Sequence, residues 1–85
     1  AASKKRVIAR DAIVSPASFT SFDVAEVYAL HGAGVEVKAS GYAIVSVTVE
    51  EGAQVIATAT DKAQVKIFQH GGQIQTRGNV KIINP

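Results

Sequence analysis

The chain repeats itself about every ten residues. Three consecutive segments begin Ala43-Ile44-Val45, Ala53-Gln54-Val55 and Ala63-Gln64-Val65. Each segment ends in turn-forming residues, such as Glu51-Gly52 and Asp61-Lys62. Tandem repetition of so short a segment predicts structurally equivalent units that stack on one another, each burying its apolar side against its neighbours.

Within the repeats, apolar and polar residues alternate at period two, which predicts β-strands with one buried and one wet face. The element "small or apolar–x–Val" recurs at spacings of ten, eight, ten and ten residues. Its copies begin at Ala25, Val35, Ala43, Ala53 and Ala63. Because the spacings are all even, every strand keeps its apolar set on the same inner face.

Two all-β architectures fit this pattern. In a β-solenoid, short strands coil around a narrow core, and equivalent valines stack in rows. The rows would contain Val27, Val37, Val45, Val55 and Val65. The rows of small Ala and Val favour the solenoid, since each rung contacts only its neighbours and needs little volume.

The alternative is an antiparallel β-meander that forms a sandwich or barrel. The same ten-residue segments would then fold back and forth, with hairpin turns at Glu51-Gly52, Asp61-Lys62 and Gly71-Gly72.

The first 23 residues differ from the rest of the chain. They begin with a basic cluster, and Pro16 interrupts the strand pattern of Val7 to Val14. We therefore expect residues 1–23 to form a basic N-terminal arm and capping segment, and residues 24–85 to form the repeat β domain.

Length and composition indicate how such a domain becomes stable. A single domain of 85 residues buries a modest fraction of its surface, and this chain has no Cys for disulfides or thiolate metal sites. Small scaffolds without such staples are commonly stabilised by oligomerisation.

The sequence shows no catalytic constellation, so we expect no enzyme and no cofactor. His31 and His70 lie beside glycines in turns, which is typical of exposed residues rather than of a metal site with three or four ligands. Glu50 and Glu51 are neighbours on the chain, so on a strand they point to opposite faces and cannot flank one bond.

The formal net charge is only +2, and four basic residues gather near the N-terminus: Lys4, Lys5, Arg6 and Arg10. These residues are candidates for docking onto another structural protein, and the body of the chain is not expected to bind nucleic acid. No apolar run approaches the roughly 18 residues that span a membrane. No signal peptide is visible, because the basic start lacks a following apolar segment.

Four large apolar residues fall on positions that the alternation assigns to the outer face: Tyr28, Leu30, Ile56 and Phe68. Such residues on the wet side of a small domain form a sticky patch, unless they are scattered by chance. Either the Phe19/Phe22 segment folds across the patch, or another subunit covers it. We therefore take them as candidates for a homo-oligomer interface.

The tandem segments AQVIATATDK and AQVKIFQHGG resemble the short-repeat β-helical proteins of bacteriophages and Bacteroidetes. The resemblance covers residues 25–72. It implies a non-enzymatic structural module that assembles as a homo-oligomer, with a trimer favoured, in a capsid decoration, fibre or spike. The implied location is the virion. Apart from the resemblance, the lack of a visible signal peptide leads us to expect the cytoplasm.

The alternative function is a β-sandwich module that binds carbohydrate or another ligand through the turns that carry His31, Tyr42 and His70.

Overall fold

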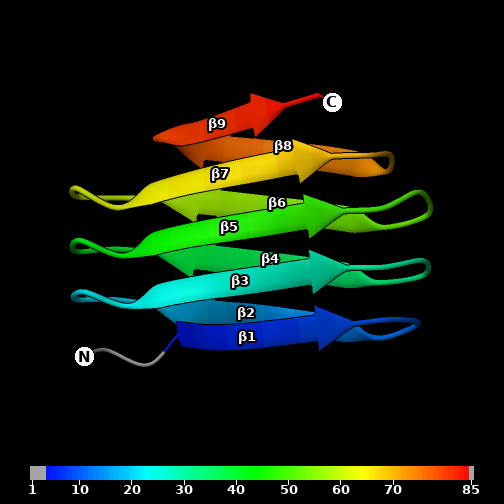
Figure 1. Ribbon diagram of the computed structural model, residues 1–85, viewed down its shortest axis with the longest axis horizontal. Helices are drawn as coiled ribbons and strands as arrows, with labels where there is room; N and C mark the ends of the chain where they lie inside the picture. The colour runs from blue at the N-terminus through cyan, green and yellow to red at the C-terminus, as the bar shows by residue number, and fades with distance from the viewer. Residues whose placement is uncertain (1–3, 85) are drawn as a thin grey trace.

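The computed structural model describes residues 4–84, and this part of the chain is all-β. The strands are short, and each is joined to the next by a tight corner (Figure 1). The strands are β1 (Lys4–Ala9), β2 (Ile13–Phe19), β3 (Val24–Ala29), β4 (Gly34–Ala39), β5 (Ile44–Val49), β6 (Gln54–Ala59), β7 (Gln64–Gln69), β8 (Gln73–Gly78) and β9 (Val80–Ile83).

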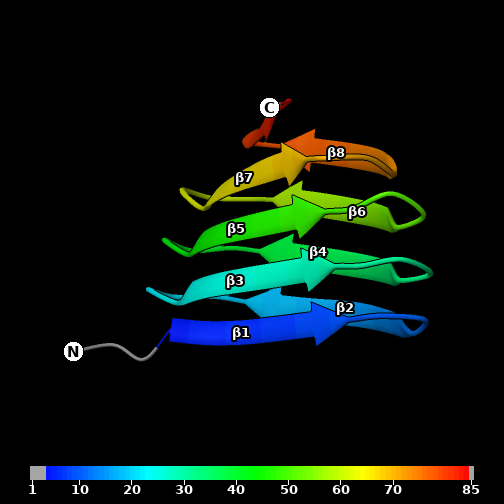
Figure 2. The same cartoon turned by 45° about the vertical axis from the view of Figure 1, so that its right-hand side comes forward.

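The strands form two parallel sheets. Sheet A has the order β1-β3-β5-β7-β9, and sheet B has the order β2-β4-β6-β8. Successive strands therefore alternate between the sheets, and each odd–even pair makes one coil of a rising spiral (Figures 1 and 2). The fold is the predicted β-solenoid, with about four coils of about 20 residues. The antiparallel meander is ruled out, because the strands pair in parallel.

The ten-residue repeat is half a coil. Val27 pairs with Val47 on sheet A, and Val47 pairs with Ile67, whereas Val37 faces them from sheet B. The expected single row of Val27, Val37, Val45, Val55 and Val65 was therefore wrong. Consecutive ten-residue segments lie on opposite sheets, so residues twenty apart are the ones that stack.

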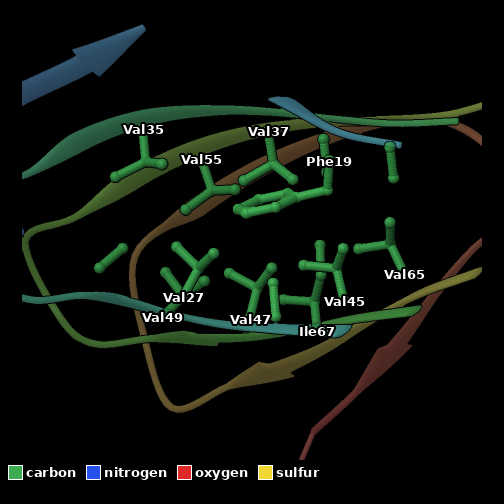
Figure 3. Packing of buried hydrophobic residues seen from close by; sticks show 14 of the residues in the cluster. Phe19, Val27, Val35, Val37, Val45, Val47, Val49, Val55, Val65 and Ile67 are labelled. Carbon is green, nitrogen blue, oxygen red and sulfur yellow. The ribbon is translucent and has the colours of Figure 1, made fainter. Parts of the chain in front are cut away.

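The core is a narrow layer of valines and alanines between the sheets. Each strand of the middle coils alternates buried and less buried residues, and none of the polar side chains whose burial the structure describes is fully buried. Phe19 is the exception in size: it is 4% exposed, and its ring lies across the core among the valines (Figure 3). The Phe19 column continues with Ala39 and Ala59, so the small residues above leave room for the ring.

The corners on the two edges use different turns. After β3 and β5, Gly32 and Gly52 have positive φ at the third turn position, which gives type II turns. After β2, β4 and β6, the positive φ falls on the second position, at Ser21, Gly41 and Asp61, which gives type II′ turns. The Asp61 carboxylate accepts a hydrogen bond from the Gly41 N–H at 3.1 Å.

Residues 4–23 form the first coil of the same solenoid, so the architecture does not change at residue 23. Residues 1–3 of the expected arm and Pro85 of the expected repeat domain lie outside the described residues. Pro16 lies in β2 at a register shift between Val14 and Ala17. A proline and a bulge on an edge strand both discourage pairing with another sheet.

We expect Ile67→Ala to lower the free energy of unfolding by about 2–5 kcal/mol, because Ile67 is fully buried in the sheet A column. Ile67→Val should cost about 0.5–1.5 kcal/mol. Urea unfolding followed by circular dichroism measures both changes. Ile56→Ala is the control, since that side chain is 47% exposed. Equal losses for Ile67→Ala and Ile56→Ala would contradict the core assignment.

Gly→Ala substitutions at a corner and in a strand should have opposite effects on stability. Gly52 has φ +85°, and a Cβ there would overlap the His31 ring. Gly52→Ala should therefore cost about 1–3 kcal/mol. Gly34 lies in β4, where a Cβ would meet only Ile13 at 3.8 Å. Gly34→Ala should raise stability by about 0.4–1 kcal/mol. Thermal unfolding of the two variants would refute this account if both shifted in the same direction.

Candidate assembly interface

The outer face of sheet A is built from three columns of outward side chains. One column, which we call the apolar column, lies near the C-terminal ends of the strands. It contains Ile8, Tyr28, Thr48, Phe68 and Ile83. The middle column, here the charged column, contains Arg6, Glu26, Ser46, Lys66 and Lys81. The third column contains Lys4, Val24, Ile44 and Gln64.

Apolar surface on this face extends along both sides of the charged column. Ile8 is 63% exposed and Ile44 is 52% exposed. Tyr28 and Phe68 are half-buried, with only Thr48 between them on β5. Large apolar groups gathered on one face of a small domain are typical of a surface that contacts another molecule, although Thr48 interrupts one column and Lys4 and Gln64 flank the apolar pair of the other.

The structure brings together only two of the four predicted interface residues. Tyr28 and Phe68 share the apolar column of sheet A. Leu30 lies at the corner that follows β3, next to this column. Ile56 lies on β6 of sheet B, between Glu36 and Gln75, on the opposite face of the molecule. Their role in an interface stays a prediction.

Sequence reasoning missed four exposed apolar residues near this face. Ile8 and Ile44 are outward positions of strands β1 and β5. Phe22 and Tyr42 lie at corners one coil apart, and their rings stack with centroids 5.1 Å apart. Alternation within Lys4–Ala9 would have identified Ile8 as an outward residue. It assigns Ala9 to the inner face, and Ala9 is indeed buried.

Three of the four residues of the predicted basic docking arm lie in β1 rather than in an arm. Lys5 forms an ion pair with Asp23 at 3.2 Å, and Arg6 forms one with Glu26 at 3.2 Å. Lys4 lies 3.8 Å from the same Glu26 carboxylate. Arg10 is exposed on the corner that follows β1. The charges of Lys4, Lys5 and Arg6 are therefore compensated within the chain, across the pairing of β1 with β3.

These contacts change the acidity of two carboxyl groups. The Thr20 N–H donates to Asp23 at 2.9 Å, and this bond, followed by the one from Lys5, lowers the pKa of Asp23. The Arg6 guanidinium, which donates to Glu26, is the main cause that lowers the pKa of Glu26.

A hollow of about 270 Å³ opens on sheet A over β5, β7 and the segment leading into β9. We call it the basic hollow, and its lining includes Ile44, Ser46, Lys66, Phe68, Asn79 and Lys81. Lys66 and Lys81 are register partners on adjacent strands. Among the described residues that line it, none is acidic.

A second hollow, of about 290 Å³, lies on sheet B where Gly34 leaves a gap between side chains. Its walls include the exposed Ile13 and Ile56, and its polar groups include Glu36, Gln54 and Gln73.

The residues of the proposed ligand-binding turns do not all lie on one edge of the solenoid. His31 and His70 lie at corners on one edge, after β3 and β7, whereas Tyr42 lies on the opposite edge, after β4 (Figure 1). Within residues 4–84, no three His, Asp or Glu side chains come together as metal ligands. The expected absence of a cofactor stays a prediction.

In comparisons with known proteins, no family model, no curated protein and no solved structure matches the chain. The described residues include no helix with the length and apolar character that crossing a membrane requires.

The ion pairs of β1 make stability depend on pH. Both carboxyl pKa values are lowered by folding, so the stabilisation is present above the pKa of the unfolded carboxyls and is lost as the pH falls through the folded values. We expect the free energy of unfolding to fall between about pH 5 and pH 2. The double variant Asp23→Asn, Glu26→Gln should show a smaller fall in urea titrations.

Asp11→Asn serves as the control for this titration, because Asp11 is exposed at the corner after β1 and takes no part in the ion pairs of β1. It should keep the wild-type pH profile. A double variant whose profile superimposes on that of the wild type would show that the β1 ion pairs do not contribute.

Proposed function

We propose that the chain is a non-enzymatic structural module that assembles with copies of itself through the outer face of sheet A. The observation that carries this proposal is the apolar column on that face, together with Val24 and Ile44 on the other side of the charged column. Ile8 and Ile44 are each more than half exposed, and Tyr28 and Phe68 add further apolar area.

The rigidity of the scaffold supports this proposal. Each coil is held to the next by parallel main-chain hydrogen bonds, so the outward columns present their side chains at a fixed repeat. A preformed surface loses little conformational entropy when it docks, which favours association.

The biological setting is part of the proposal. The resemblance of residues 25–72 to short-repeat β-helical proteins supports a homo-oligomeric phage virion component, such as a capsid decoration, fibre or spike protein, with a trimer favoured. Docking onto another structural protein through Lys4, Lys5, Arg6 and Arg10 would compete with the ion pairs that three of them make within the chain.

A ligand-binding module is the second candidate function. The sheet B hollow favours it, because Ile13 and Ile56 offer apolar contact beside the amides of Gln54 and Gln73. Amides and apolar surface together suit a sugar ring. Titration with a glycan panel would test it, and a glycan that binds only when Gln54 and Gln73 are intact would favour this function.

Light scattering on a size-exclusion column at two concentrations tests self-assembly. We expect a species larger than the 8.9 kDa monomer that persists on dilution. Phe68→Lys and Ile44→Lys should each weaken the association at least about tenfold, because a buried charge then lies in the interface.

Ile56→Lys is the matched control, since it introduces the same charge on the opposite sheet, and it should leave the mass unchanged. Circular dichroism establishes that each variant is folded. A wild-type monomer at both concentrations would overturn the proposed function. Dissociation by Ile56→Lys alone would assign the interface to sheet B.

A further inference from the structure

The basic hollow of sheet A concentrates uncompensated positive charge. Lys66 and Lys81 lie side by side on β7 and β9, and like charges opposite each other across strands are unfavourable. No ion pair within residues 4–84 involves either lysine, in contrast to Arg6 in the same column. The arrangement favours a partner that supplies negative charge.

Negative charge gathers at a corner of the same chain. Glu50 and Glu51 begin the corner that follows β5, which we call the acidic corner (Figure 1). Within the described part of the chain, neither carboxylate takes part in an ion pair. The acidic corner projects from one edge of the solenoid, while the basic hollow lies on the face of sheet A.

We propose that the acidic corner of one copy docks into the basic hollow of a second copy, with Glu50 and Glu51 facing Lys66 and Lys81. This inference rests on the proposed self-assembly and specifies which two surfaces meet. The contact joins two different surfaces, so it is heterologous. Such contacts close into a ring when the rotation between copies allows it.

The spacing of the two surfaces supports this match. Successive corners on the edge are one coil apart, since the Leu30 N–H bonds to Ala9 and the Glu50 N–H bonds to Ala29. Neighbouring strands of the face are also one coil apart, about 4.8 Å. Side chains of the edge can therefore lie in register with the strands of a second copy over several coils.

Apolar contact accompanies the charges in this arrangement. Leu30 lies one coil from Glu50 on the edge, and Ile44 lies one coil from Lys66 on the face. When the acidic corner faces Lys66, Leu30 falls at the level of β5, which carries Ile44. The half-buried Leu30 and the 52% exposed Ile44 are then covered together.

Charge reversal in the full chain tests the proposal by light scattering and sedimentation. Two double variants should each weaken self-association at least about tenfold: Lys66→Glu with Lys81→Glu, and Glu50→Lys with Glu51→Lys. The fourfold variant restores opposite charges and should recover association to within about threefold of the wild type. Lys38→Glu with Arg77→Glu, on the outer face of sheet B, is the matched control and should leave association unchanged.

The outcomes separate this inference from the proposed function. A wild-type oligomer that neither reversal weakens would overturn the docking and leave self-assembly through sheet A standing. In another outcome, Lys66→Glu with Lys81→Glu weakens association and the fourfold variant does not restore it. This outcome would overturn the acidic corner as the occupant of the basic hollow and favour an acidic segment of another protein. A wild-type monomer would overturn the proposed function itself.

Discussion

Parallel pairing between residues about twenty apart is the constraint on which the rest of this molecule depends. Each strand bonds to the strand one coil away, so every side chain lies over its equivalent in the next coil. Val and Ala, with Ile67 and Phe19, suffice for the core because each coil contacts only its neighbours. The corners must also stack one coil above another. Gly52 provides both the positive φ of its corner and the space that the His31 ring of the neighbouring corner occupies.

The first coil is adapted to its place at the end of the stack. Phe19 fills the core of the first coil, and its column continues with the smaller Ala39 and Ala59. Lys5 occupies an inward register position of an edge strand and pairs with Asp23, and a charge at such a position discourages pairing with another sheet. The basic residues of β1 therefore contribute to the integrity of the solenoid as well as to its charge.

The outer surfaces are unequal although the core is uniform. Sheet A carries the apolar column, the exposed Ile44 and the paired Lys66 and Lys81, whereas the edge beside it carries Glu50 and Glu51. This inequality is what supports a role in assembly. A symmetric repeat needs no such difference to fold, because outward positions contribute little to the packing of the core.

The sequence by itself determined that the chain is all-β and which side of the repeat strands after residue 24 faces inward, and it favoured a solenoid over an antiparallel meander. Alternation and even spacing are local properties, and they are sufficient for these conclusions. Only the tertiary structure decided which repeats are neighbours. Alternate segments lie on opposite sheets, so Tyr28 and Phe68 share a column while Ile56 faces away, and Lys4 to Arg6 meet acidic partners about twenty residues on. These contacts join distant positions, and a local period does not specify how many segments complete one coil.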